Sequence, residues 1–289
     1  MRLRRLIPWV ALALSGCPAW WPTSGPDGMV EIPTASILLG SDDTPGQPHN
    51  PVPVPQAPTR REARISSFWL DRTEVTRTAY QRFLDATDYR PPSVEEPWAD
   101  DGWTWKDGRF PQGTGDHPVV LVSWYDAREY CAWMGKRLPT EAEWQLAALG
   151  PASATRMYPW GQHYDASRLN HGRNQQPNFD ASDGWERTAP VGSFPQGATD
   201  AGLQDMYGNA WEWTRDIRAE HWDDYQGHGP AGLQDPHSPA PGLYAAVRGG
   251  SYFFDVSMTT VGERNAFLTE IRRKTSGFRC AQDHDGSGA

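Results

Sequence analysis

The stretch Gly-Asn-Ala-Trp-Glu-Trp at residues 208–213 contains one acid in an unusual setting. Glu212 stands between two tryptophans, directly after a Gly-Asn turn, and this combination is awkward for an ordinary strand or helix. A carboxylate that is walled off from water must be compensated by a positive charge. One interpretation is an ion pair with an arginine, such as Arg215 or Arg248.

Three helices are indicated upstream of this turn, and each follows a residue that can cap it. Thr76 precedes a pattern with apolar residues on one face over 77–89. Ser123 precedes a second pattern, which Gly135 ends. Thr140 and an acid three residues later form a capping box before the third helix. The spacing of the apolar side chains predicts that these helices pack against a core.

Short strands are expected on both sides of the helices. Residues 29–43 predict a strand pair that opens the domain, 44–62 are Pro-rich and predict a loop, and 63–75 predict another strand. From about residue 151 helical periodicity fades, and short strands return only at 245–253 and 276–282. Neither an internal repeat nor a break in composition divides the chain. We therefore expect one irregular, loop-rich α+β domain.

Composition limits the classes of function. The chain has 289 residues and a formal net charge of −9, so it lacks the basic character of a nucleic-acid-binding protein. No apolar run approaches the roughly 20 residues of a membrane-spanning helix. The 28 Gly and 26 Pro residues are typical of a loop-rich fold. Fifteen tryptophans predict either large core anchors or an aromatic ligand groove.

The N-terminus is typical of an export signal. Three arginines precede a short apolar stretch, and Leu-Ser-Gly-Cys follows at residues 14–17. The sequence predicts a lipoprotein signal peptide at 1–16, lipidation of Cys17, a tether at 17–28 and a domain at 29–289. A membrane in the cell envelope, on the periplasmic side or at the cell surface, would then be a partner through the lipid anchor. The alternative is an ordinary signal peptide with a chance cysteine.

Seven motifs occur in an order that resembles the formylglycine-generating enzyme family, also called the sulfatase-modifying factor domain. The resemblance covers residues 29 to about 282 and implies a compact C-type-lectin-like fold. The motifs are MVEIPTASILLGSDD, FWLDRTEVTRTAYQRFLDATDY, HPVVLVSWYDAREYCAWMGKRLPTEAEWQLAALG, YPWG, GNAWEWTRD, RGGSY and GFRC.

The resemblance implies two structural calcium sites. Calcium is a hard cation that takes oxygen ligands, including the carbonyls of loops. By match, the first site consists of backbone carbonyls, an amide oxygen and one carboxylate, from Tyr207, Gly208, Asn209, Ala210 and Glu212. The second site, whose spacing is one residue shorter here than in the family, consists of Asn170, His171, Asp183 and Trp185. Of these, His171 and Trp185 match positions that contribute only backbone atoms.

The family's copper site is not matched. Copper(I) is held by two cysteine thiolates, and their positions are Phe254 and Thr259 in this chain. Copper is therefore not expected. Cys131 and Cys280 stand where the family carries structural cysteines, and their usual partners are missing. They are either free thiols or paired with each other.

The resemblance also implies a substrate groove near Trp213, Ser251 and Arg279, where a protein or peptide could bind. A purely structural role for these residues, with Arg279 as a buried ion-pair partner, is the alternative. Three functions remain open: a calcium-stabilised binding or accessory lipoprotein, an active oxidoreductase of the formylglycine-forming or non-haem-iron type with an unrecognised metal site, and a structural part of an envelope complex.

Overall fold

The computed structural model describes residues 25–39, 61–94, 103–151, 156–172, 180–217, 226–229, 232–238, 242–253 and 264–284. The predicted signal peptide at 1–16, the lipidation site Cys17, and the copper-site positions Phe254 and Thr259 lie outside the described residues. No helix among the described residues is both long enough and apolar enough to cross a membrane.

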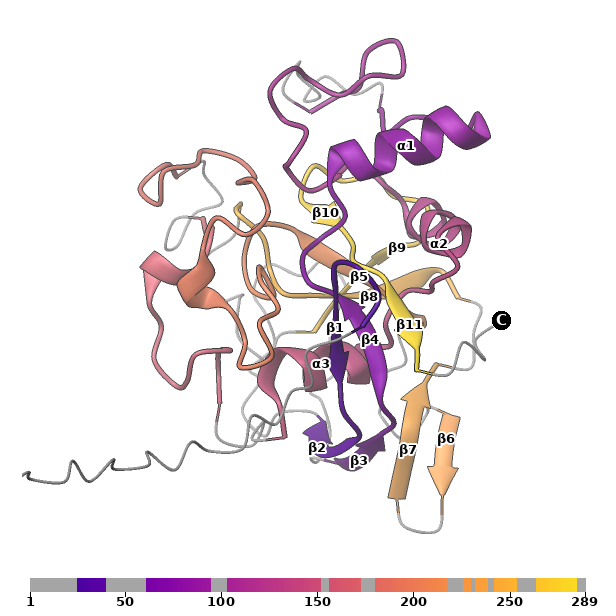
Figure 1. Ribbon diagram of the computed structural model, residues 1–289, viewed down its shortest axis with the longest axis vertical. Helices are drawn as coiled ribbons and strands as arrows, with labels where there is room; N and C mark the ends of the chain where they lie inside the picture. The colour runs from indigo at the N-terminus through magenta and orange to yellow at the C-terminus, as the bar shows by residue number, and fades with distance from the viewer. Residues whose placement is uncertain are drawn as a thin grey trace, which may run out of the picture.

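Three small sheets and three helices form the described part of the chain (Figure 1). The first sheet has the order β1-β4-β11, the second β10-β5-β8-β9 and the third β2-β3-β7-β6. Their strands are β1 (Met29–Ile32), β2 (Ala35–Leu39), β3 (Arg61–Ile65), β4 (Phe68–Asp71), β5 (Trp211–Ile217), β6 (Gln226–Gly229), β7 (Gly232–His237), β8 (Tyr244–Arg248), β9 (Asn265–Leu268), β10 (Ser276–Gly277) and β11 (Ala281–Asp283). The α+β, loop-rich class expected from the sequence is confirmed.

The strand pair expected within residues 29–43 is wrong in its pairing. β1 and β2 do form there, but β1 pairs antiparallel with β4 while β2 pairs antiparallel with β3. The single strand expected over 63–75 is likewise two strands, β3 and β4, in different sheets. Each short strand satisfies its backbone groups with a partner from farther along the chain, and local alternation cannot identify that partner.

The three helices are confirmed together with their caps. They are α1 (Arg77–Thr87), α2 (Trp124–Trp133) and α3 (Glu141–Leu149). The hydroxyl of Thr76 accepts a hydrogen bond from the Ala79 N–H, and both Ser123 and Thr140 form complete capping boxes. These caps satisfy N–H groups that the first turn leaves without partners.

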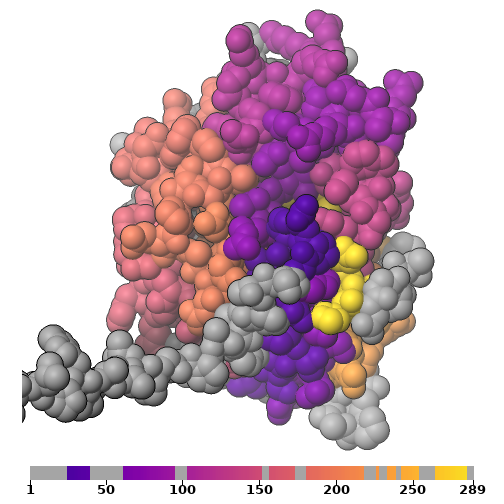
Figure 2. All heavy atoms as spheres, viewed as in Figure 1, coloured from indigo at the N-terminus to yellow at the C-terminus, as the bar shows by residue number. Residues whose placement is uncertain are grey.

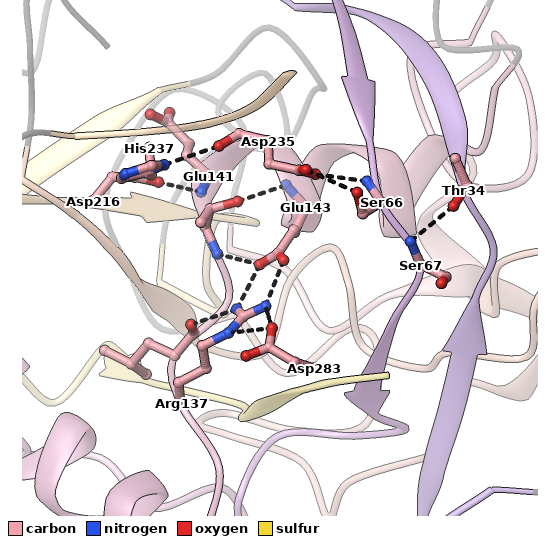
Figure 3. Close-up of polar contacts among 12 residues, drawn as sticks. Thr34, Ser66, Ser67, Arg137, Glu141, Glu143, Asp216, Asp235, His237 and Asp283 are labelled. Atoms are coloured by element: carbon pink, nitrogen blue, oxygen red, sulfur yellow. Dashed lines mark hydrogen bonds and ion pairs between the residues drawn. The ribbon is translucent and has the colours of Figure 1, made fainter. Parts of the chain in front are cut away.

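An arginine joins the start of α3 to the last strand (Figure 3). The Arg137 guanidinium donates to both carboxylate oxygens of Glu143, at 2.8 and 2.7 Å, and also to Asp283 in β11. Because β4 pairs with both β1 and β11, the first and last strands of the described residues lie in one sheet, on one face of the molecule (Figure 2).

Among the described residues, the core consists of two large clusters and a smaller one around Trp103 and Tyr252. One large cluster packs β1–β4 against α3, and the other packs α1 and α2 against β5 and β8. Several tryptophans are large anchors in these clusters or beside them: Trp103, Trp144, Trp211 and Trp213 are all less than 2% exposed. Burial of these four side chains supports their role as core anchors.

A disulfide joins Cys131 in α2 to Cys280, which directly precedes β11. The two Cα atoms are 5.7 Å apart although the residues are separated by 149 positions. Both side chains are fully buried. Of the two alternatives left open by the sequence, the structure selects pairing over free thiols.

Candidate functional site

The carboxylate of Glu212 forms a buried ion pair with Arg279. The Arg279 Nη2 donates to Glu212 Oε1 at 2.7 Å, and its Nε donates to Oε2 at 2.8 Å. The indole N–H of Trp144 donates to the same Oε2 at 2.8 Å. The arginine interpretation of Glu212 is therefore confirmed, but its partner is not one of the two arginines named as examples.

Three strands and a loop hold Arg279 in place. β10 lies parallel to β5, so the chain reaches Arg279 directly beside Glu212. The remaining guanidinium hydrogens go to the carbonyls of Asp71, Arg72 and Gln204, at 2.8–3.1 Å. Burial acts to lower the Arg279 pKa, but the nearby carboxylates, Glu212 first, outweigh burial and raise it. Arg279 therefore keeps its positive charge in the folded protein.

A second buried acid, Glu74, holds the turn before β5. Glu74 Oε1 accepts from the Ala210 N–H at 3.1 Å, and Oε2 accepts from the Asn209 side-chain amide at 2.9 Å. Burial raises the pKa of Glu74, and the charges of Asp205 and Glu212 add to the increase. Sequence reasoning missed Glu74, because nothing around it in the chain marks it as the partner of a turn 135 residues away.

The residues matched to the second calcium site lie together. The carboxylate of Asp183 accepts from the His171 N–H and from the Trp185 N–H, both at 2.9 Å. Asn170 precedes this turn and is 1% exposed. Its side-chain Oδ1 is buried and has no hydrogen-bond partner among the described residues.

The two matched sets are neighbours rather than separate sites. The Asn209 N–H donates to the Asn170 carbonyl at 3.0 Å, and the Asn170 side-chain amide donates to Asn209 Oδ1 at 3.1 Å. Gly208 lies against the same carbonyl: a Cβ there would be 2.2 Å from the Asn170 oxygen, and its φ is +86°. Glycine is required at this position for both reasons.

The two sets differ in how well they fit a calcium ion. The Asn170 set has an amide oxygen without a hydrogen-bond partner among the described residues, beside a carboxylate that accepts only backbone N–H groups, and such oxygens suit a hard cation. At the other set, both carboxylate oxygens of Glu212 are engaged by Arg279, and Asn209 Oδ1 already accepts from Ala189 at 2.8 Å. The side-chain oxygens of the 207–212 set are therefore already engaged, and an ion there would depend on the backbone carbonyls. Calcium binding at either set stays a prediction.

The three residues matched to the substrate groove are all buried. Trp213, Ser251 and Arg279 have 0% exposure. The indole N–H of Trp213 donates to the Val122 carbonyl at 3.0 Å. Their contacts are those of structural residues, with Arg279 as the buried ion-pair partner that was the alternative. The groove itself stays a prediction.

The described residues also line a cavity of about 510 Å³. Its lining comes from the segment after β8, the loop between β9 and β10, and the loop after α1. The lining residues are Val94, Phe253, Ile271, Arg272, Arg273, Lys274 and Thr275. None of them was selected from the sequence, because they come from three segments that only the fold brings together.

Among the described residues, no group of three or more His, Cys, Asp or Glu side chains is arranged to hold a metal. The fold and the buried polar sites define an irregular α+β scaffold whose loops are fixed by ion pairs, amide contacts and a disulfide. Residues 21–284 match the sulfatase-modifying factor enzyme 1-like domain. The chain belongs to this family, which includes the formylglycine-generating enzymes.

This chain is similar both to proteins named as enzymes and to a protein named as inactive. It is 33% identical to the formylglycine-generating enzyme of Thermomonospora curvata, over 89% of this chain and 93% of that protein. It is 31% identical to the enzyme of Bos taurus, over 90% and 76%. It is also 32% identical to a Mus musculus protein named inactive C-alpha-formylglycine-generating enzyme 2, over 96% and 92%.

Solved structures share the fold. PvdO from Pseudomonas aeruginosa superposes with a TM-score of 0.67 at 24% identity, covering 88% of this chain and 94% of that one. Treponema denticola variable protein 1 superposes with a TM-score of 0.64 at 22% identity, covering 88% and 94%. At these identities the likeness concerns the fold alone.

Proposed function

We propose that this chain is a non-oxidising member of the family: an exported, lipid-anchored, calcium-stabilised lipoprotein that serves as a binding or accessory module. The observation that carries the proposal is the Cys131–Cys280 disulfide. The chain has three cysteines, and Cys17 belongs to the N-terminal signal pattern. The domain therefore has no thiol left, whereas copper(I) requires soft thiolate ligands.

The residues at the family's copper positions support the same conclusion. Phe254 offers no ligand, and Thr259 offers only a hard oxygen. The relative named inactive, in which 92% of the length is covered, indicates that this scaffold persists without the oxidase activity. The disulfide also supports export, because such bonds persist in oxidising compartments.

The relatives named as formylglycine-generating enzymes favour a second candidate, an active oxidase with a different metal site. One assay separates the two candidates. The pure protein is incubated with copper, O₂, a reductant and a peptide that contains a sulfatase-type cysteine, and the peptide is analysed by mass spectrometry. The proposal expects no conversion of the cysteine to the aldehyde.

The control for this assay is a variant that lacks both domain cysteines, Cys131→Ser with Cys280→Ser. Aldehyde formation by the wild type that survives in this variant would overturn the proposal and establish a metal site built from other residues. Aldehyde formation that disappears in the variant would overturn it as well, because the reductant would then have released functional thiols.

A further inference from the structure

The 510 Å³ cavity combines apolar walls with positive charge. Val94, Phe253 and Ile271 supply the apolar walls, and Arg272, Arg273 and Lys274 are consecutive cations. Among the described residues, the lining includes no carboxylate. The volume lies within the range of cavities that hold small organic molecules.

The three cations are not equivalent. Arg272 is compensated, since its Nη2 lies 2.8 Å from the buried Asp126 carboxylate. Arg273 is half-buried, and its guanidinium lies 4.3 Å from the ring centroid of Phe267. No carboxylate pairs with Arg273 among the described residues, and burial lowers its pKa. Half-burying a guanidinium without a carboxylate partner costs free energy, and a bound anion would offset that cost.

A second group in the cavity also lacks a partner. Thr275 lines the cavity, is only 3% exposed, and its hydroxyl has no hydrogen-bond partner within the described part of the chain. A hydroxyl can donate to an anion, and buried polar groups without partners are rare in folded proteins. Nearby, the Lys274 ammonium lies 5.1 Å from the ring centroid of Phe253, so positive charge continues along the apolar wall.

We propose that this cavity binds a small organic anion with an apolar body, whose acidic group is held by Arg273 and Thr275. The apolar body lies against Val94, Phe253 and Ile271. Arg273 supplies charge-assisted hydrogen bonds, and Thr275 supplies a neutral one. The proposal names a ligand class for the binding module proposed above. It rests on that proposed function only in treating the chain as a binding module.

Two dyes with one skeleton test the proposal. The probe is 8-anilinonaphthalene-1-sulfonate, an aromatic anion, and its matched control is N-phenyl-1-naphthylamine, which lacks the sulfonate. Fluorescence titration of the full-length protein is expected to show one saturable anionic dye per chain. Its affinity should weaken as salt is added, whereas binding of the neutral dye should be weaker from the start and insensitive to salt.

Variants locate the site. Arg273→Gln should weaken binding of the anionic dye by about tenfold or more, since a hydrogen bond to a charged group is lost. Arg273→Lys should retain most of the affinity, and Thr275→Val should reduce it less than Arg273→Gln does. Arg82→Gln, which removes an exposed arginine of α1, is the control and should bind like the wild type.

Several results would overturn the proposal: no binding of the anionic dye by the folded wild type, equal affinity for the two dyes, or equal affinity in Arg273→Gln and the wild type. If Arg273→Gln does not fold, two measurements still test the proposal. The first is the salt dependence of dye affinity in the wild type. The second is Arg273→Lys, because a lysine variant that loses affinity for the anionic dye at an unchanged melting temperature contradicts a role for charge. Dye binding and aldehyde formation are separate readouts, so failure here does not imply failure of the proposed function.

Discussion

At Glu212 a negative and a positive charge are buried together, with 1% exposure for one side chain and 0% for the other. Removing one partner of such a pair leaves an uncompensated charge, which costs about 3–5 kcal/mol. Arg279→Leu should therefore lower the free energy of unfolding by about that amount, measured by urea denaturation. Adding Glu212→Leu should restore part of the loss, because the uncompensated carboxylate is then removed.

The matched control is an exposed ion pair. Arg109 lies 3.2 Å from Asp85, but the two side chains are 67% and 53% exposed. Arg109→Leu should change the free energy of unfolding by less than about 1 kcal/mol. Equal losses in the Arg279 and Arg109 variants would mean that burial does not set the importance of the Glu212 pair.

The loop around Asn170 is where a calcium ion can be tested. If calcium binds there, free ion at 100-fold over its dissociation constant adds about 2.7 kcal/mol of stability. Chelation should then lower the melting temperature, and Asp183→Asn should remove most of the response. Glu212→Gln should leave the response to chelator intact, since Arg279 engages that carboxylate. An identical wild-type melt with and without chelator would contradict the calcium prediction.

Between elements, the disulfide is a covalent constraint. It links α2 to the residue before β11 across 149 positions. Closing a loop of that length in the unfolded chain is worth about 5 kcal/mol in the chain-entropy treatment. Cys131→Ala with Cys280→Ala should therefore lower the melting temperature clearly. Reductant should lower the melting temperature of the wild type toward that of the double variant and leave the melting temperature of the double variant unchanged. A wild type whose melting temperature does not change on complete reduction would refute this.

The end of β5 is joined to the start of α3 by a buried acid (Figure 3). Asp216 accepts hydrogen bonds from the Glu141 N–H and the Ser238 N–H. Burial raises the pKa of Asp216 to about 7, although these two backbone donors act in the opposite direction. Since the folded protein holds this proton more tightly than the unfolded chain, the contribution to stability is complete below about pH 4 and is lost as the pH rises through 7.

Between pH 5 and pH 8, Asp216 should cost the wild type roughly 3 kcal/mol of unfolding free energy. Asp216→Asn lacks the titration, so its stability should fall less over the same interval, whatever its stability at pH 5. Urea denaturation at the two pH values measures the difference. Parallel pH profiles for the wild type and the variant would show that Asp216 does not titrate in this range.

For the whole molecule, the prediction concerns attachment to the membrane. The Leu-Ser-Gly-Cys sequence at 14–17 predicts lipidation of Cys17 after removal of residues 1–16. Cys17→Ser should move the protein from the membrane fraction to the soluble fraction, as followed by immunoblotting. The mass of the purified wild type should include acyl chains. A wild type that is soluble and retains residues 1–16 would contradict the anchor.

The sequence alone predicted the features that depend on near neighbours. The caps at Thr76, Ser123 and Thr140 and the apolar spacing behind them specify the three helices, because a helix is stabilised by groups within four residues of one another. The α+β class and the family were also predictable, the first from the three helix patterns with short strands around them and the second from the order of the motifs.

Tertiary structure alone decided which distant groups meet. Glu212 pairs with an arginine 67 residues away, and Cys131 pairs with a cysteine 149 positions away. The sequence had marked a carboxylate that needed a cation, but it offered several arginines of equal standing. The same holds for β1 and β2, whose alternation permits many partners, and for the cavity at Arg273. Which distant residues come into contact depends on how the chain folds back on itself. Burial of the whole core determines that path, and no local sequence pattern does.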